Sequence, residues 1–166
     1  MLQNVRHNRN RRNAFTLLDL TITILILGIV AAIALPKFAQ SLDQIRVDSA
    51  ARFIAADLNY ARHRAQISSQ NVPVNFTTSP AGYSLPTTPH LNRSGASYAV
   101  NLADAGYNVT LSLSLQGNSS VTYNPFGLPL AGTPLSAMSS GTITVTSGTK
   151  AKTVTISPQT GRASIQ

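Results

Sequence analysis

The 166-residue sequence predicts an α+β fold, in which one long N-terminal helix precedes an antiparallel β-rich head. Three observations carry this prediction. Residues 17–35 are almost entirely apolar and hold a single charge, Asp19. Apolar side chains recur at helical spacing between residues 47 and 65. From about residue 70, apolar residues alternate with Ser and Thr between frequent turn signals, which is typical of short strands.

The first 14 residues, MLQNVRHNRNRRNA, carry four Arg and no acidic residue. Basic residues before an apolar run hold that end of a chain in the cytoplasm, so residues 1–14 are expected to be a targeting leader. Beyond this leader, nine Lys and Arg face five Asp, a mildly basic balance that is typical of a solvated surface. The chain has no Cys, which excludes a disulfide framework and a thiolate metal site.

Residues 15–36 are expected to form a membrane-spanning half of the helix. As a helix, residues 17–35 would extend about 28 Å, close to the thickness of a bilayer's hydrocarbon core. Pro36 removes one backbone hydrogen bond, so it is expected to kink the helix or to mark its exit from the membrane.

Residues 37–69 are expected to form the amphipathic half of the same helix. Its apolar stripe consists of Val47, Ala50, Ile54, Leu58, Ala61 and Ala65. Asp48 and Arg52 lie opposite the stripe and are spaced for an i, i+4 ion pair. Phe53 and Tyr60 flank the stripe, where they would extend the core or contact a neighbouring subunit. The basic tract at residues 62–64 is expected to be a solvated face.

Residues 70–166 are predicted to form the β-rich head. Strands are expected at 72–76, 83–85, 111–115, 121–123, 143–145, 154–156 and 162–165, with a hairpin turn at 147–151. Pro73 predicts that the first strand lies at a sheet edge. The stretches 86–98 and 127–141, which are rich in Pro, Gly and Ser, are expected to be loops.

Three processing schemes fit a basic leader followed by an apolar run. Ala32-Ile33-Ala34 suits an ordinary signal peptidase, which would release a secreted β-domain. Arg11-Arg12 matches part of a twin-arginine signal, although the next Phe follows three residues later instead of two. The third scheme cuts before the apolar run.

The third scheme is favoured by a resemblance. The segment AFTLLD at residues 14–19, with the apolar run and Pro36, resembles the class III signal of type IV pilins and pseudopilins. In that family, prepilin peptidase removes the leader and methylates the new N-terminal residue. The resemblance therefore implies cleavage between Ala14 and Phe15 and N-methylation of Phe15. Ala14 stands where the family usually has Gly, and Asp19 where it usually has Glu.

Asp19 is an unfavourable residue in an apolar helix, because a carboxylate at the bilayer centre costs about 2.5–3.5 kcal/mol on insertion scales. The resemblance implies that it pairs with the amine freed at Phe15, on its own or a neighbouring subunit, and sets the register of assembly. The alternative is that Asp19 only reaches the membrane interface.

The head adds to the resemblance. Residues 49–62 (SAARFIAADLNYAR) and 154–162 (VTISPQTGR) resemble the GspH/FimT group, which comprises minor pseudopilins of type II secretion and minor type IV pilins. The resemblance implies a pilin-like fold and, as partners, other pilin or pseudopilin subunits, prepilin peptidase and an inner-membrane assembly platform. It also implies a single pass through the bacterial inner membrane, with the leader in the cytoplasm and the head in the periplasm.

The residues provide no catalytic or metal-binding constellation. Paired acid catalysis needs two carboxylates close together, and beyond Asp57 only Asp104 remains. His7, His63 and His90 are scattered, and His90 with Asp104 supplies two ligands where a metal site needs three or four. We therefore expect no enzymatic activity, no cofactor and no metal.

Three functions from different classes remain. The preferred one is a minor pseudopilin of a type II secretion-type pseudopilus that supports protein export. The first alternative is a minor type IV pilin that binds DNA for uptake, with Lys150, Lys152 and Arg162 as candidate contacts. DNA-binding members of the group carry Gly-Arg-x-Arg, whereas residues 161–164 read GRAS, so nucleic acid is not the expected partner. The second alternative is the secreted β-domain.

Overall fold

The computed structural model describes residues 16–90 and 93–166, in which the chain forms one helix, α1 (Leu17–Ser68), and ten strands. The chain divides into two compact units, Met1–Phe38 and Ala39–Gln166, and α1 contributes residues to both. All the strands belong to the second unit. The predicted order, a long helix followed by a β-rich head, is therefore confirmed.

Within the second unit, α1 buries the predicted apolar stripe. None of its six residues, from Val47 to Ala65, is more than 1% exposed. Ala51 and Ala55 are buried beside them, and these small side chains let the sheets pack close to the helix. The helix ends at Ser68, and Ser69 follows with φ 52°, a left-handed conformation that does not continue a helix.

The larger sheet is antiparallel and has six strands in the order β3-β2-β1-β5-β6-β7. Its strands are β1 (Val72–Thr78), β2 (Ala81–His90), β3 (Arg93–Asn101), β5 (Ser120–Tyr123), β6 (Pro129–Ala131) and β7 (Ser136–Ala137). The smaller sheet has the order β10-β9-β8-β4 and is also antiparallel. Its strands are β4 (Thr110–Ser114), β8 (Gly141–Ser147), β9 (Lys150–Ile156) and β10 (Ala163–Ile165).

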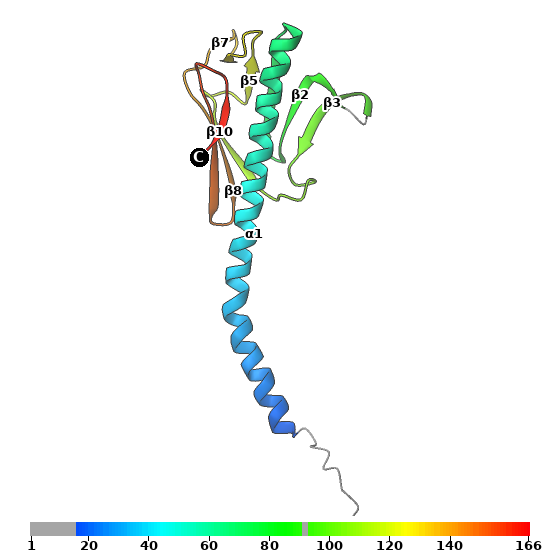
Figure 1. Ribbon diagram of the computed structural model, residues 1–166, viewed down its shortest axis with the longest axis vertical. Coiled ribbons are helices and arrows are strands. Elements are labelled where there is room, and N and C mark those ends of the chain that lie inside the picture. The colour runs from blue at the N-terminus through cyan, green and yellow to red at the C-terminus, as the bar shows by residue number, and fades with distance from the viewer. Residues whose placement is uncertain (1–15, 91–92) are drawn as a thin grey trace, which may run out of the picture. The chain divides into compact units, whose positions relative to one another are not determined.

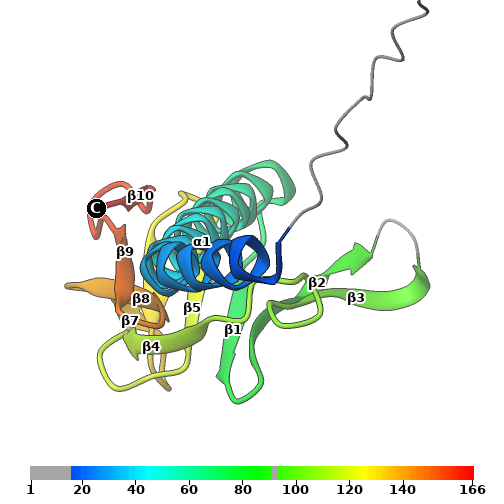
Figure 2. The ribbon, with the colours of Figure 1, turned by 90° about the horizontal axis from the view of Figure 1, so that it is seen from below.

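The two sheets lie around the second part of α1. Figure 1 shows β8 and β10 on one side of this part of the helix, with β2 and β3 on the other. Figure 2 shows β1, β4 and β5 between these groups, so that the strands form a curved wall against the helix. The hairpin turn at 147–151 is confirmed, because Ser147 pairs with Lys150 at the tip of β8 and β9.

Pro73 does not place β1 at a sheet edge, so this prediction is wrong. β1 lies between β2 and β5. Its register with β5 includes Pro73, whereas its register with β2 begins only at Asn75. The proline therefore occupies a part of the strand that has a partner on one side only, where its missing N–H removes no ladder hydrogen bond.

The two predicted loops contain strands, so these predictions are also wrong. The stretch 86–98 holds the end of β2 and the start of β3. The register of this pair shifts between Leu85 and Pro89, and such an irregularity accommodates prolines that cannot donate to a ladder. The stretch 127–141 holds the short strands β6 and β7, of which β7 pairs through only two residues.

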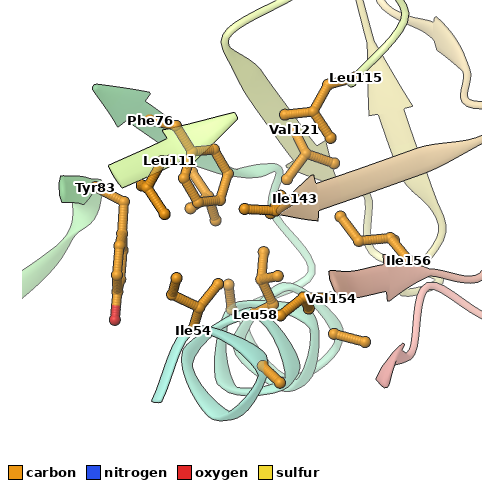
Figure 3. Packing of buried hydrophobic residues seen from close by; sticks show 14 of the residues in the cluster. Ile54, Leu58, Phe76, Tyr83, Leu111, Leu115, Val121, Ile143, Val154 and Ile156 are labelled. Atoms are coloured by element: carbon orange, nitrogen blue, oxygen red, sulfur yellow. The ribbon is translucent and has the colours of Figure 1, made fainter. Parts of the chain in front are cut away.

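The hydrophobic core of the second unit forms where α1 meets both sheets. Figure 3 shows Ile54 and Leu58 pointing from the helix toward Phe76, Leu111 and Ile143 on the strands. Both helix residues are at most 1% exposed, and burial of such a side chain stabilises a fold by about 1.5–3 kcal/mol. Phe53 packs against this core from the side, which confirms the simpler of its two predicted roles.

Candidate assembly site

The first part of α1 exposes its apolar side chains. Every described side chain from Thr16 to Ala34 is exposed, including Leu17 at 80% and Ile33 at 63%. An 18-residue window of α1 has a mean hydropathy of 2.5 and is 0% buried, so by length and composition this helix is able to cross a membrane. A contiguous apolar surface of this kind marks a site of interaction with lipid or with another protein.

Asp19 closes the first turn of α1. Its Oδ2 accepts hydrogen bonds from the Thr16 hydroxyl at 2.8 Å and from the Thr16 backbone N–H at 3.3 Å. In return, the backbone N–H of Asp19 donates to Thr16 Oγ1 at 3.2 Å. This reciprocal arrangement is a capping box, and it turns the carboxylate toward the positive end of the helix dipole.

The hydroxyls of Thr21 and Thr23 have backbone partners as well. They donate to the carbonyl oxygens of Leu18 and Leu20, each at 2.8 Å. Polar side chains in this segment are therefore satisfied within the helix, as a lipid environment requires.

The other residues predicted for processing and assembly are placed only in part. Ala14 and Phe15 lie outside the described residues. Pro36 lies inside α1, which continues through it to Ser68, so the proline does not end the helix.

The three candidate DNA contacts do not come together. Lys150 begins β9, whereas Arg162 precedes Ala163, the partner of Ile156 at the opposite end of that strand. At about 3.3 Å per residue, the two ends of β9 are roughly 20 Å apart. Lys152 has an acidic partner, because its Nζ lies 3.8 Å from Asp48 Oδ1.

The predicted Asp48–Arg52 ion pair is wrong. Asp48 pairs with Lys152 on β9, and Arg52 is exposed without an ion-pair partner among the described residues. A carboxylate on this flank of the helix reaches the adjacent strand, a contact that helical spacing alone could not predict.

A basic hollow lies between α1 and the loop that follows β9. Its volume is about 570 Å³, and its lining residues are Asn59, Arg62, His63, Thr160 and Arg162. Two of them belong to the tract that was expected to be only a solvated face. The missed signal is the combination of that tract with the Thr-Gly-Arg sequence about 100 residues later.

A second cluster joins α1 to the β2–β3 hairpin. Asp57 Oδ2 accepts hydrogen bonds from the hydroxyls of Tyr83 at 2.6 Å and Tyr98 at 2.8 Å. Burial has the larger effect and the hydrogen bond to this carboxylate the next larger, and both raise the pKa of the two phenols above the ordinary value of 10. A small hollow of about 180 Å³ adjoins Asp57, Tyr98 and Thr88.

No three His, Cys, Asp or Glu side chains within residues 16–90 and 93–166 are grouped so that they could hold a metal ion. His63 lines the basic hollow, and Asp104 accepts a hydrogen bond from Asn101 Nδ2 at 2.8 Å. The side chain of His90, the other ligand considered, lies outside the described residues.

Comparison with known proteins identifies the family. The family model described as "Type II transport protein GspH" matches residues 50–160. The chain therefore belongs to the GspH family. This confirms the predicted resemblance, and it makes the chain a minor pilin- or pseudopilin-like protein whose fold suits assembly with other pilin subunits.

Relatives and solved structures agree with membership of the GspH family. The chain is 31% identical over 163 residues to "Pilin-like protein PilA1" of Thermus thermophilus, covering 93% of this chain and 99% of the relative. Crystal structures of the Pseudomonas aeruginosa type IV minor pilin FimU share the fold at TM-scores of 0.52 and 0.53, with 18% identity. These matches cover 72% of this chain and 91% and 87% of the FimU chains.

Proposed function

We propose that the protein is a minor subunit of a pilus-like filament, anchored by a single pass in the bacterial inner membrane and assembled through the apolar part of α1. The observation that carries this proposal is the exposed surface from Leu17 to Phe38, which has no partner within the described part of its unit. A filament of such helices would bury these side chains against those of neighbouring subunits, as the bilayer does before assembly.

Processing between Ala14 and Phe15 by prepilin peptidase, followed by N-methylation of Phe15, belongs to the same proposal. The support comes from the capping box, in which the Asp19 carboxylate turns back toward the start of α1. An amine freed at Phe15 would emerge one residue before Thr16, near that carboxylate. On a neighbouring subunit, the same amine would supply the charge that makes Asp19 favourable inside a filament.

The N-terminus of the mature protein tests both the anchor and its processing. Mass spectrometry of the mature protein should give an N-terminus at methylated Phe15. A mature chain that begins at Leu35 would contradict the proposal, because ordinary signal peptidase would then have released a secreted β-domain.

Replacement of one side chain tests the role of Asp19. Asp19→Ala should leave membrane insertion intact and reduce the fraction of protein recovered in filaments. Asp19→Glu should restore it, and Thr23→Ala in the same segment serves as a neutral control. Normal incorporation of Asp19→Ala would refute the assembly role.

For the machine that this subunit serves, we propose a type II secretion-type pseudopilus that supports protein export. The description of the matching family model favours it. A type IV pilus is the second candidate, because the 31%-identical relative is named a pilin-like protein. Deletion of the gene in its own host separates them: loss of exported enzymes with intact DNA uptake and surface pili supports the pseudopilus, and the reverse supports the pilus.

A further inference from the structure

The basic hollow has the chemistry of an oxyanion site. Arg62, His63 and Arg162 line it, together with the hydroxyl of Thr160. Asn59 also lines it, but its amide N–H groups already donate to the backbone carbonyls of Ala55 and Ala163. No Asp or Glu lines it. Two guanidinium groups around one hollow repel each other unless an anion lies between them, and their planar forks match the geometry of a carboxylate or phosphate.

Arg62, which lines the hollow, also has a polar atom whose hydrogen-bonding capacity is unused. Its Nε is buried and has no hydrogen-bond partner among the described residues. The hydroxyl of Tyr123 is also buried and has no hydrogen-bond partner among the described residues. Burial raises the pKa of this phenol, and the charge of the nearby Arg62 lowers it by a smaller amount. Buried donors without acceptors are uncommon and costly, so an acceptor at this position would stabilise the site.

The hollow is held in shape by hydrogen bonds on both of its sides. Asn59 exchanges two hydrogen bonds with the backbone of Ala163, next to Arg162. The loop before it is closed by bonds from Gly161 N–H to the Ser157 carbonyl at 2.8 Å and from Ser157 N–H to the Arg162 carbonyl at 2.9 Å. Arg162 therefore begins from a fixed backbone position opposite Arg62, as an organised site requires.

We propose that this hollow binds one carboxylate, from an acidic side chain on a neighbouring subunit, when the head packs in the filament. This inference rests on the proposed function for the identity of the partner, whereas the affinity for a carboxylate follows from the hollow alone. The volume of about 570 Å³ exceeds that of a carboxylate, so the bound group enters with part of its side chain and with bridging water.

A nucleic acid fits this face less well than a protein. Non-specific binding needs several phosphate contacts along a track, together with stacking surfaces for bases. Lys150 lies at the far end of β9, Lys152 is paired with Asp48, and no Phe, Tyr or Trp is among the residues that line the hollow. The hollow therefore offers charged partners to one anionic group, but not to the successive phosphates of a nucleic acid.

Titration of the full chain in neutral detergent tests the carboxylate site directly. The probe is N-acetyl-aspartate amide, which carries one carboxylate, and N-acetyl-asparagine amide is the neutral control. In NMR spectra, the Arg62 and Arg162 Nε–H signals should shift saturably with the first probe and stay unchanged with the second. Arg162→Gln should weaken binding at least about tenfold, the value of one charge-assisted hydrogen bond.

Arg52→Gln is the matched control variant, because Arg52 is exposed on the same helix and away from the hollow. It should bind the probe as the wild-type chain does. Arg162 is itself exposed, so its replacement tests the site without disturbing the core. An absent shift, or an equal loss in both variants, would overturn the carboxylate site.

The partner is tested by filament incorporation and by competition with DNA. Arg162→Gln should enter filaments less efficiently than Arg52→Gln, and normal entry would overturn the role of the neighbouring subunit. A single-stranded oligonucleotide that displaces the aspartate probe and shifts the same arginines more strongly would assign the hollow to nucleic acid instead. If the wild-type chain binds the probe but enters no filament, the proposed function fails while the carboxylate site stands.

Discussion

Asn59 on α1 and Ala163 on β10 exchange two hydrogen bonds across 104 residues of sequence. Asn59 Nδ2 donates to the Ala163 carbonyl at 3.0 Å, and the Ala163 N–H donates to Asn59 Oδ1 at 3.1 Å. The side-chain amide thus takes the place of a neighbouring strand at the edge of the four-stranded sheet. This contact attaches the last strand to the helix and fixes one wall of the basic hollow.

Asn59→Ala should lower the free energy of unfolding by about 2 kcal/mol, because it removes both hydrogen bonds to Ala163 and leaves the Ala163 N–H without its acceptor. It also removes a third hydrogen bond, from Asn59 Nδ2 to the Ala55 carbonyl within α1. Hydrogen exchange should show the Ala163 amide losing protection before the amides of β8. Asn75→Ala, at an exposed position on β1, is the control and should have a small effect. Unchanged protection at Ala163 would contradict the role given to Asn59.

The sequence was sufficient to predict the helix and most strands, because burial there is periodic. The stripe from Val47 to Ala65 is buried at the predicted spacing. Leu111 is buried on β4, and Ile143 and Val145 are buried on β8, where Thr alternates with them. A helix or a half-buried strand repeats its apolar residues at its own period, and no tertiary information is needed to see it.

The predictions that were wrong concern segments whose conformation depends on pairing with another strand. Residues 86–98 contain Pro86 and Pro89, which predict a loop, yet pairing with β3 past a register shift keeps β2 extended. The position of Pro73 likewise depends on where β2 begins to pair with β1. The conformational preferences of the residues in one segment cannot reveal such pairing, because the partner strand lies elsewhere in the sequence.

The candidate site was predictable only where its residues are adjacent in sequence. Asp19 and its helix could be found from one contiguous segment. The basic hollow could not, since it combines Arg62 with Arg162 across 100 positions of the chain. The partner of Asp48 was missed for the same reason, because Lys152 is brought to it by the packing of β9 against α1.

The Asp57–Tyr83–Tyr98 cluster should make the head less stable in alkali. Burial and then the Asp57 hydrogen bond raise the pKa of both phenols above 10, so folding favours their neutral form. A raised folded-state pKa stabilises the fold fully below about pH 10, the unfolded value, and this contribution is lost as the pH rises further. The free energy of unfolding, followed by near-ultraviolet circular dichroism in urea, should therefore be constant up to about pH 10 and fall as the pH rises above it.

Tyr83→Phe should reduce this alkaline loss, and at pH 8 it should destabilise the head by about 1.5–3 kcal/mol, since a hydrogen bond to a charged group is removed. Tyr60→Phe is the control, because Tyr60 is 46% exposed. Part of the alkaline loss should remain in Tyr83→Phe, because burial also raises the pKa of Tyr123. An identical pH profile in Tyr83→Phe and the wild-type chain would refute the assignment.

Asp43 and Asp48 should differ in their contribution to stability. Asp48 and Lys152 are each more than one-third exposed, so solvent screens the pair and Asp48→Asn should cost at most about 0.5 kcal/mol. Asp43 accepts a hydrogen bond at 3.0 Å from Ser147, which is buried, so Asp43→Ala should cost about 1–3 kcal/mol. Urea unfolding of both variants checks the order, and a larger loss in Asp48→Asn would contradict it.

Gly161 should be the least replaceable glycine of the head. Its φ of 65° favours glycine, and an added Cβ would overlap the carbonyl oxygen of Gly127 and lie 3.3 Å from Tyr123 Cε1.

Gly117 is a matched control, because its φ of 78° is similar but an added Cβ would meet nothing within 4 Å. Gly117→Ala should therefore cost only the backbone term, about 1–2 kcal/mol. Gly161→Ala should cost clearly more in urea unfolding, because the loop that carries Thr160 and Arg162 must move away from Gly127. Equal losses in the two variants would show that the loop is free to shift, and that the close approach of Gly161 to Gly127 does not hold the hollow in shape.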